Sequence, residues 1–481
     1  MRAALTAAAA ILAALLLAPA ASAVELQPGD IVVADPNAFG GSGGLIDVNP
    51  DSGSQTAVSS NAVSSQDLFV DPSSVALLRD GTLAVADPNA FGGSGGIIRV
   101  DPGTGQESVL ASNASSPSIA FFADPVGVAV DSLGRLLVTD SNAAGGSGAV
   151  ISVDTSTGAQ SLVSSNDNST ADLFARPVGI TVERNGTILV ADPDSGASGA
   201  IIAVDPQTGQ QKVVTDNATS QTDLFADPLG VAVETPGTLL VANTAPDPAA
   251  NGVVLVNRSS GQQYALATDG AFAAPTGITM DLDGNALIAD AAAFGGGGGV
   301  IRVNPSGAQR STVTGNPNAP GALLEDPTGL TVIPPTCQGL YATIVGTQGA
   351  DAITGTPAAD VISGRGGDDI VDGRDGADLI CGDDGRDRLI GHDGRDRILG
   401  GAQGDVILGG NGRDFLKGET GNDKIDGGKG KDRLYGQQQR DNLVGGKGRD
   451  LLKGGPGRDK LTGGPAHDRL RGGPGKDKQK Q

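Results

Sequence analysis

The chain has 481 residues, with 55 Asp and Glu against 33 Lys and Arg, and its net charge is −22 at pH 7. The acidity lies in residues 24–345, which hold nine Lys or Arg and thirty-two Asp or Glu, whereas residues 346–481 hold twenty-three of each. So acidic a first part is not expected to bind nucleic acid or anionic membranes, and it attracts cations instead. Residues 413–481 have a balance of +7 and could contact anionic polymers, although a solvated surface of Asp and Arg pairs is the favoured interpretation.

The first 23 residues predict a cleaved export signal. Arg2 precedes a short apolar run, and small residues follow it up to Ala23. The run is too short for a membrane span, and no second long apolar stretch follows, so we expect no membrane span in the mature chain. The mature protein is therefore expected to begin at Val24 and to be secreted into the extracellular space.

Residues 24–335 predict a β-propeller. A strand-like phrase recurs six times at intervals of about 50 residues, and each copy is followed by a Gly-rich loop, a second apolar phrase, a tight turn and another short strand. Four short strands per repeat are typical of a propeller blade. An open array of β-sheets is the alternative. The six copies lie at 31–35, 83–87, 136–140, 188–192, 239–243 and 287–290.

The phase of this repeat predicts how the ring closes. The chain enters at the second strand of a blade, at 31–35, and leaves after a first strand, at 329–333. Pairing these two ends completes a sixth blade and removes exposed sheet edges. The phrase DPVGVAVDSLGRLLVTDSNAAGGSGAVISVD at 124–154 resembles the six-bladed propellers of the NHL-repeat and gluconolactonase-like group. That resemblance implies a fold only, since such propellers include binding modules, lactonases and lyases.

One face of the propeller is expected to carry the function. The connections from second to third strands and from one blade to the next are long, whereas the other connections are tight turns. We call the side with the long connections the long-loop face, and we expect any ligand there because binding residues concentrate in elaborate loops.

Carboxylates recur at this face, and two interpretations of them are open. They could hold a calcium ion near the central channel, or they could serve only as turn residues that every blade repeats. The first set ends the second strands and the other precedes prolines: Asp35, Asp87, Asp140, Asp192 and Asp290, with Asn243 in the fifth blade, and Asp71, Asp124, Asp227 and Asp326.

Phenylalanines also recur at equivalent places. One set stands just before the prolines and is expected to pack between blades: Phe69, Phe122, Phe174, Phe225 and Phe272. A second set, Phe39, Phe91 and Phe294, lies in the glycine-rich loops, where packing is again the expected role and ligand contact the alternative.

The sequence favours a non-enzymatic role. Both histidines, His392 and His467, lie after the propeller, which excludes a Ser/His/Asp triad within it. A metal-dependent lactonase or hydrolase with its site on the long-loop face remains the alternative, because it needs only carboxylates around a divalent ion.

The only cysteines are Cys337, in an expected linker at 336–345, and Cys381. An even pair in an exported protein predicts a disulfide between them.

From Asp351 to Asp477 an aspartate stands at every ninth residue, and we call this series the aspartate ladder. Glycine opens each unit, and all but the last unit place an aliphatic residue two positions after the aspartate. These units resemble RTX, or hemolysin-type, calcium-binding repeats. The resemblance implies a parallel β-roll over 346–477, followed by a basic tail at 478–481, with several Ca2+ ions bound. The implied ligands are Asp351, Asp360, Asp369, Asp378, Asp387, Asp396, Asp405, Asp414, Asp423, Asp432, Asp441, Asp450, Asp459 and Asp468.

Electrostatics predicts that folding of the roll requires calcium. Carboxylates stacked about 4.8 Å apart repel one another by roughly 0.9 kcal/mol in water, and by more at a partly buried edge. One aliphatic residue in nine gives a thin core to offset this repulsion. Calcium would convert the repulsion into ligation, so folding and binding are expected to be coupled.

The units differ from one another. Arg or Lys often precedes the ladder aspartate, which introduces an ion pair that competes with calcium. The fourth glycine is missing at Ala358, Gln403, Gln439 and Ala466, so the turns there are doubtful, and firm sites are expected mainly from Asp369 to Asp396 and from Asp414 to Asp432.

The sequence as a whole predicts an all-β protein, a six-bladed β-propeller followed by a parallel β-roll. Its expected partners are calcium ions and an extracellular glycan or cell-surface polymer.

Overall fold

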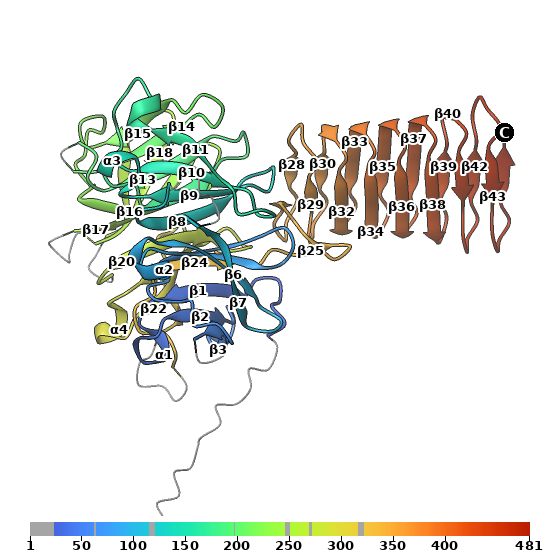
Figure 1. The fold of residues 1–481 in the computed structure, drawn as a ribbon. Coiled ribbons are helices and arrows are strands. Elements are labelled where there is room, and N and C mark those ends of the chain that lie inside the picture. The colour runs from blue at the N-terminus through green and yellow to red at the C-terminus, as the bar shows by residue number, and fades with distance from the viewer. Residues whose placement is uncertain are drawn as a thin grey trace, which may run out of the picture.

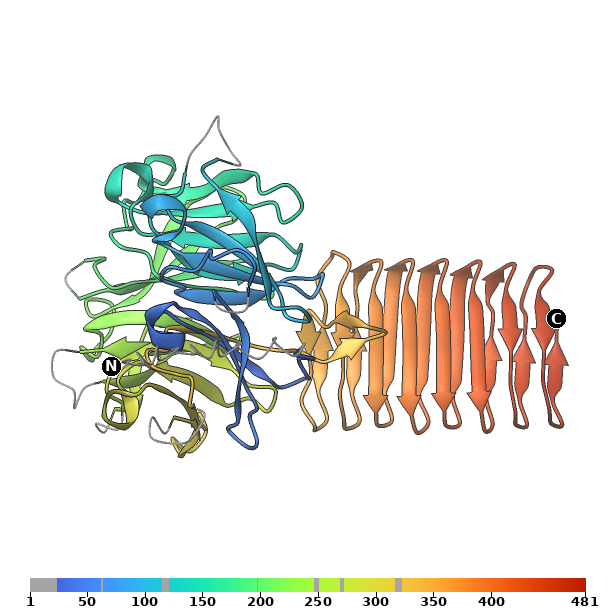
Figure 2. The same ribbon diagram turned by 60° about the horizontal axis from the view of Figure 1, so that its bottom comes forward.

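The computed structural model contains a β-propeller followed by a β-solenoid that extends from it as a separate rod (Figures 1 and 2). It describes residues 24–61, 64–114, 121–196, 198–245, 251–268, 272–315 and 322–481. The predicted export signal lies outside these residues. No helix in the described part of the chain is long and apolar enough to cross a membrane.

The first propeller blade is built from both ends of the domain. Its strands are ordered β24-β1-β2-β3, and β24 pairs antiparallel with β1 so that Val332 lies opposite Ile31. The predicted ring closure is therefore confirmed. The four strands are β24 (Gly329–Val332), β1 (Ile31–Asp35), β2 (Gly44–Val48) and β3 (Gln55–Ser60).

The other five blades are continuous in sequence, and each is a four-stranded antiparallel sheet. The six blades confirm the predicted number. Their strands are β4 (Ser74–Leu77), β5 (Leu83–Asp87), β6 (Gly96–Asp101) and β7 (Gln106–Ser112); β8 (Pro125–Val130), β9 (Leu136–Asp140), β10 (Ala149–Val153) and β11 (Gln160–Ser165); β12 (Gly179–Val182), β13 (Ile188–Asp192), β14 (Ala200–Val204) and β15 (Gln211–Asp216); β16 (Asp227–Thr235), β17 (Thr238–Thr244), β18 (Gly252–Asn257) and β19 (Gln263–Ala267); β20 (Pro275–Met280), β21 (Ala286–Asp290), β22 (Gly299–Val303) and β23 (Arg310–Thr314).

Second strands are buried along their whole length, as in Leu83–Asp87, so the propeller core lies between the blades. The phenylalanines before the prolines fill this core, as predicted, with Phe272 only 1% exposed. Short helical turns occupy the long-loop face: α1 (Ala38–Gly41), α2 (Ala90–Gly93), α3 (Ala143–Gly146), α4 (Ala293–Gly296) and the 3-10 turn η1 (Asn166–Asn168).

The loop phenylalanines also pack. Phe39 has a positive φ of 58°, and its ring folds back over Gly44, where an added Cβ would lie 2.5 Å from the ring. Phe91 and Phe294 repeat this arrangement over Gly96 and Gly299. The role of these rings is therefore to cover the start of the third strand, although Phe294 remains 43% exposed.

The solenoid is a parallel β-roll, as the repeat predicted, in which strands 18 residues apart pair side by side. Its two sheets enclose one stack of aliphatic side chains running from Ile344 to Leu461, nearly all of them fully buried. Each unit therefore contributes one core residue, which explains why the aliphatic position recurs at every ninth residue.

Alternate units form alternate sheets of the roll. The eight-stranded sheet contains β27 (Ile344–Val345), β29 (Val361–Ser363), β32 (Leu379–Asp384), β34 (Arg397–Ala402), β36 (Phe415–Thr420), β38 (Arg433–Gln438), β41 (Leu451–Lys453) and β43 (Arg469–Arg471). The ten-stranded sheet contains β28 (Ala352–Thr354), β30 (Ile370–Asp372), β31 (Asp375–Gly376), β33 (Arg388–Gly394), β35 (Val406–Gly412), β37 (Lys424–Gly430), β39 (Asn442–Val444), β40 (Lys447–Gly448), β42 (Lys460–Thr462) and β44 (Lys478–Lys480).

A small hairpin, β25 (Thr336–Cys337) with β26 (Leu340–Tyr341), connects the two parts. Cys337 forms a disulfide with Cys381 of β32, with Cα atoms 5.8 Å apart, so the predicted pairing is confirmed. Together with Leu379 and Leu399 these cysteines form a buried cluster that holds the hairpin on the outer surface of the eight-stranded sheet.

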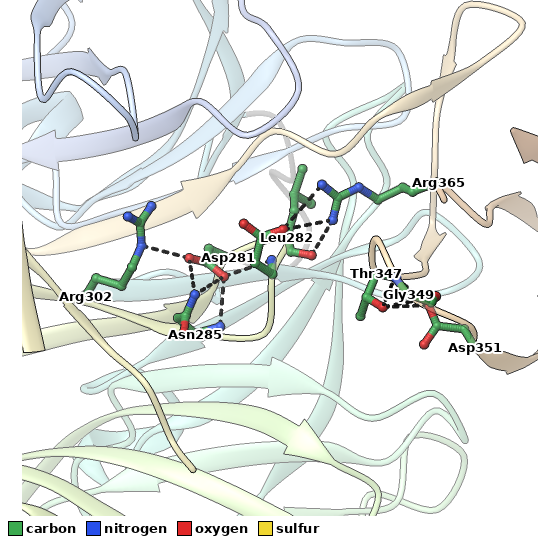
Figure 3. A network of polar contacts seen from close by, with 9 residues as sticks. Asp281, Leu282, Asn285, Arg302, Thr347, Gly349, Asp351 and Arg365 are labelled. Atoms are coloured by element: carbon green, nitrogen blue, oxygen red, sulfur yellow. Dashed lines mark hydrogen bonds and ion pairs between the residues drawn. The ribbon is translucent and has the colours of Figure 1, made fainter. Parts of the chain in front are cut away.

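The roll packs against the tight-turn face of the propeller. The Arg365 guanidinium donates hydrogen bonds to the carbonyl oxygen of Leu282 and to Asp283, in the turn between β20 and β21 (Figure 3). A cavity of about 430 Å³ lies between the innermost strands and the first coil, lined by Arg79, Glu183 and Asp360 among others. The long-loop face, on the opposite side of the ring, is left uncovered by the roll.

Candidate metal centre

The ladder aspartates lie along the two edges of the roll, immediately before the strands. Each edge carries aspartates 18 residues apart, because one coil contains two units. Along both edges the backbone N–H of one aspartate donates to the Oδ1 of the aspartate one coil further on; from Asp387 to Asp405, for example, the distance is 2.9 Å. From Asp369 onward, one carboxylate oxygen of each rung is thus committed to holding adjacent coils in register, whereas Asp360 Oδ1 is buried without a donor.

The second carboxylate oxygen has no such partner. In twelve consecutive aspartates of the ladder Oδ2 is buried and accepts no hydrogen bond, and these side chains are at most 9% exposed. A buried carboxylate oxygen without a donor is costly unless a proton or a cation neutralises it. The twelve are Asp369, Asp378, Asp387, Asp396, Asp405, Asp414, Asp423, Asp432, Asp441, Asp450, Asp459 and Asp468.

The glycine that opens each unit leaves space beside this oxygen. A Cβ added to Gly409 would lie 2.6 Å from Asp414 Oδ2 and 2.7 Å from the carbonyl oxygen of Gly427 in the next coil. Gly427 repeats the arrangement with Asp432 Oδ2 at 2.8 Å and the Gly445 carbonyl at 2.6 Å. Any side chain at this position would fill the space where a carboxylate and a carbonyl oxygen converge.

Burial also changes the acidity of the ladder. It raises the pKa of Asp378 to about 7 and that of Asp405 to about 8, although the backbone hydrogen bond to each carboxylate opposes the shift. Neighbouring ladder aspartates add to the increase in pKa through charge repulsion. Without a cation these carboxylates therefore tend to take up protons near neutral pH.

The first two rungs differ from the rest. Thr347 and Thr356 stand where several later units have glycine, and their side chains bond the free oxygen. The Thr356 amide and hydroxyl donate to Asp360 Oδ2 at 2.6 and 3.0 Å, and Thr347 contacts Asp351 Oδ2 in the same way (Figure 3). Sequence reasoning treated Asp351 and Asp360 like the other ligands. Threonine at the second position of these two units was the signal that could have separated them.

Two of the turns considered doubtful keep their shape. Gln403 and Gln439 replace the fourth glycine, yet they take φ values of 74° and 76°. Asp405 and Asp441, two residues further on, still carry an orphaned Oδ2. The missing glycine therefore costs backbone strain in these units without displacing the aspartate.

The expected competition from basic neighbours is not found. No ion pair in the described part of the chain joins a ladder aspartate to Arg or Lys. Arg386, Arg395 and Arg413 immediately precede ladder aspartates and are exposed, because successive side chains of an extended segment point to opposite sides.

The donor set suits a hard cation. Within the described residues, no three His, Cys, Asp or Glu side chains converge as a metal cluster. The available donors are carboxylate oxygens and backbone carbonyls, which are the ligands that calcium takes in flexible geometry. Transition metals that favour imidazole or thiolate do not match this set.

The strand-end carboxylates of the propeller serve the fold instead. Asp35 is fully buried, and its oxygens accept hydrogen bonds from the amides of Asn37 and Ala38 and from those of Glu325 and Asp326. Backbone amides donate equivalent hydrogen bonds to the corresponding side chains of the other blades, which are Asp87, Asp140, Asp192 and Asp290 and the side-chain carbonyl of Asn243. The interpretation as turn residues is confirmed for this ring, which has no oxygen to spare for a metal.

The second ring of the long-loop face is also internally bonded. Asp71 and Asp326 accept from the side-chain amides of Asn89 and Asn37, and Asp124 accepts from Asn142. Asp227 pairs with Arg176, which stands where other blades have aspartate. Sequence reasoning missed Arg176, although its place in the phrase ARPVG, against ADPVG in the preceding blade, marks it.

Two sequence families match parts of the chain. The RTX calcium-binding nonapeptide repeat matches four segments, residues 345–380, 382–416, 408–443 and 444–478. The NHL repeat matches residues 122–144. The roll is thus made of RTX calcium-binding repeats, and the propeller contains an NHL repeat. No curated protein matches the chain.

Several solved propellers have a similar course. A gluconolactonase from Xanthomonas campestris is 17% identical, with a TM-score of 0.40 over 65% of this chain and 88% of that one. TolB from Acinetobacter baumannii is 16% identical, with a TM-score of 0.41 over 59% and 62%. The calcium-binding protein regucalcin from Agrobacterium tumefaciens is 14% identical, with a TM-score of 0.37 over 55% and 78%. Scores this low add nothing to the fold assignment, which rests on strand order.

Proposed function

We propose that this is a secreted calcium-binding protein whose roll folds on calcium and whose propeller presents a recognition face. One observation carries the proposal: twelve consecutive buried aspartates keep one oxygen without a donor, each beside the space left by a glycine. Divalent cations would neutralise these oxygens and bridge them to backbone carbonyls. The proposed ligands are the twelve aspartates from Asp369 to Asp468, while Oδ2 of Asp351 and Oδ2 of Asp360 accept hydrogen bonds from threonine.

Export is the second part of the proposal. The N-terminal segment has the layout of a cleaved signal, so the mature chain would consist of a propeller from Val24 to residue 335, a linker at 336–345, the roll at 346–477 and a short basic tail. The disulfide between Cys337 and Cys381 fits an oxidising compartment. Extracellular calcium modules typically bind at about 0.1–1 mM, a concentration that the cytosol does not reach.

The recognition face is assigned to the long-loop side of the propeller. The roll packs on the tight-turn side, through Arg365 and the turn at Leu282, so the long loops remain accessible (Figure 2). A carbohydrate or cell-surface polymer is the proposed class of ligand.

The lactonase alternative gains no support from this face. Such an enzyme needs several carboxylates free to hold a divalent ion, and the fully buried ring from Asp35 to Asp290 is engaged by backbone amides. A lactone and ester screen with and without calcium tests the alternative, because turnover abolished by Asp71→Asn or Asp124→Asn would contradict a binding-only role.

The calcium proposal is tested on the full-length protein by amide hydrogen exchange during a calcium titration. Protection of residues 364–477 is expected to appear with calcium near the millimolar range and to vanish in chelator, while protection of the propeller strands stays unchanged. Equal protection of residues 364–477 in chelator and in 10 mM calcium (a concentration roughly tenfold above the expected range) would overturn the proposal.

A further inference from the structure

The outer face of the eight-stranded sheet of the roll carries an ordered pattern of side chains. Beyond the hairpin that covers its first strands, two rows of outward side chains follow the roll axis, one residue from each row per coil. The first row is Arg397, Phe415, Arg433, Leu451 and Arg469, and the second row is Leu399, Lys417, Tyr435, Lys453 and Arg471.

Cationic and apolar side chains alternate in both directions on this face, which we call the checkerboard face. Along the first row the arginines occupy every second coil, with Phe415 and Leu451 between them. In the second row the lysines occupy the intervening coils, beside Phe415 and Leu451, so three successive coils present one cation and one apolar group each. Leu399, beside Arg397, is buried against the hairpin.

The centre of the checkerboard face is held together by ring contacts. The Arg397 guanidinium lies 4.7 Å from the Phe415 ring centroid, the Phe415 and Tyr435 rings are 5.2 Å apart, and Lys453 Nζ lies 5.1 Å from the Tyr435 centroid. These cation–π contacts fix the positions of the charged groups before any ligand arrives. A preorganised surface loses less side-chain entropy on binding.

A depression of about 390 Å³ adjoins this stack, and it is lined mainly by Arg395, Arg397, Arg413, Arg433 and Phe415. The two other lining residues, Asp396 and Asp414, are ladder aspartates that are only 1% exposed. The one carboxylate paired on the face is Glu419, 2.5 Å from Lys417. The surface available to a ligand is therefore strongly positive, although the chain as a whole is acidic.

We infer that the checkerboard face binds a linear acidic polysaccharide of the polyuronate class. Arginines two coils apart are about 10 Å apart, because parallel strands are spaced about 4.8 Å. This matches the disaccharide repeat of an extended polyuronate, in which carboxylates on one side recur at every second sugar. The guanidinium groups can form paired hydrogen bonds to carboxylates, and the apolar side chains between the arginines can pack against the C–H faces of the sugar rings.

Nucleic acid fits this surface less well. Phosphates along one strand of a duplex recur about every 3.4 Å of helix axis, far more closely than the arginine spacing. A duplex is also convex, whereas the checkerboard face is one side of a nearly straight sheet (Figure 1).

The opposite sheet provides a matched control. One outward row there also has a cation in every second coil, but its neighbouring row has no cation among these coils, and neither row includes an aromatic ring. The first row is Arg388, Val406, Lys424, Asn442 and Lys460, and the second is Ile390, Leu408, Asp426, Val444 and Thr462. Substitutions there change the net charge of the roll without touching the checkerboard face.

The inference rests on the calcium-dependent fold proposed above, since the face exists only when the roll is folded. The test measures the fluorescence polarisation of a labelled galacturonate hexamer as full-length protein is added in the presence of calcium. The methyl-esterified hexamer, which has the same backbone without charge, and a single-stranded hexanucleotide serve as comparison probes.

Binding of the free-acid hexamer is expected, with affinity reduced at least tenfold by methyl esterification and by Arg397→Gln with Arg433→Gln. Phe415→Leu with Tyr435→Leu should also weaken binding, whereas Lys424→Gln with Lys460→Gln should change it less than twofold. Absence of binding, equal losses from the two charge pairs, or equal affinity for the hexanucleotide would each overturn the inference. Hydrogen exchange on the same samples shows independently whether the calcium-dependent fold holds.

Discussion

Thr356 donates its backbone amide and its hydroxyl to the same oxygen of Asp360, at 2.6 and 3.0 Å. From Asp369 onward the equivalent oxygen is buried without a donor. In the two rungs nearest the propeller Oδ2 is therefore satisfied without a cation, although Asp360 Oδ1 is buried without a donor, and in the twelve rungs beyond them Oδ2 is not satisfied. We expect folding of the roll to be polarised, with a calcium-independent base at the propeller and calcium-dependent coils beyond it.

The threonine hydroxyl bonds can be removed without changing side-chain shape. Thr347→Val with Thr356→Val should lower hydrogen-exchange protection of residues 346–363 in chelator, because each change removes the hydroxyl bond to a carboxylate and leaves only the backbone amide as donor. A hydrogen bond to a charged group contributes about 1.5–3 kcal/mol. The number of calcium ions bound should stay the same. Thr462→Val, on the outer side of the ten-stranded sheet, is the control. A wild-type protein that shows no protection of residues 346–363 in chelator would contradict a calcium-independent base.

Asp414→Asn tests a single proposed ligand. Asparagine keeps the shape and the Oδ1 hydrogen bond from Asp396, which measures 3.0 Å, but removes the negative charge. Isothermal titration of the full-length protein should show fewer ions bound, together with an affinity weakened about tenfold at the neighbouring rungs. Asp426→Asn removes the same charge from the exposed outer side of the roll and should keep the number of bound ions, with a much smaller change in affinity. Identical curves for the two variants would show that Asp414 is not a ligand.

Protons and calcium should substitute for one another in the roll. Burial raises the pKa of Asp378 to about 7 and of Asp432 to about 7, above the ordinary value of 3.8. An acid whose pKa is raised in the folded state stabilises the fold below its unfolded pKa, and this stabilisation is lost as pH rises through the folded pKa. The unfolded pKa of aspartate is about 4. In chelator the roll should therefore be more stable at pH 4 than at pH 8. In calcium this difference should shrink, since the cation takes the place of the protons, and higher stability at pH 8 than at pH 4 in chelator would contradict the prediction.

Glu107 gives the propeller its own pH dependence. Glu107 stands at the start of the fourth strand of its blade, where four other blades have glutamine. Burial raises the pKa of the Glu107 carboxyl to about 7. The charge that Glu107 gains above pH 7 should destabilise the propeller, so Glu107→Gln should raise its melting temperature by about 2–4 °C at pH 8.5 for a gain near 1 kcal/mol. Little change is expected near pH 5, where the carboxyl is protonated. A variant less stable than wild type at pH 8.5 would refute this reasoning.

The disulfide should stabilise the junction of the two parts. It joins positions 44 residues apart, and loops of this length contribute about 2–4 kcal/mol when cross-linked. Cys337→Ala with Cys381→Ala should therefore lower protection of residues 336–363 and leave the blades unaffected. Leu340→Ala, which changes an exposed side chain on the same hairpin, serves as the control. An unchanged exchange pattern in the cysteine variant would show that the disulfide does not stabilise the junction.

Much of this molecule follows from local pattern. The nine-residue spacing of aspartate and aliphatic residues determines a coil of 18 residues with one core side chain per unit, and the phase of the propeller repeat determines that β24 must close the ring with β1. The disulfide also followed, because the chain has only two cysteines. These features depend on short periods or on elimination, which a sequence displays directly.

Only the tertiary structure decided which carboxylates are free. Asp35 and Asp369 were both candidate calcium ligands in the sequence, but Asp35 receives amides from Glu325 and Asp326, nearly 300 residues away, and Asp369 Oδ2 receives none. The checkerboard face is equally hidden in the sequence, because its rows join residues from alternate units and exclude the units between them. A hydrogen bond or a surface row depends on which segments meet in space, and side-chain type alone does not specify that meeting.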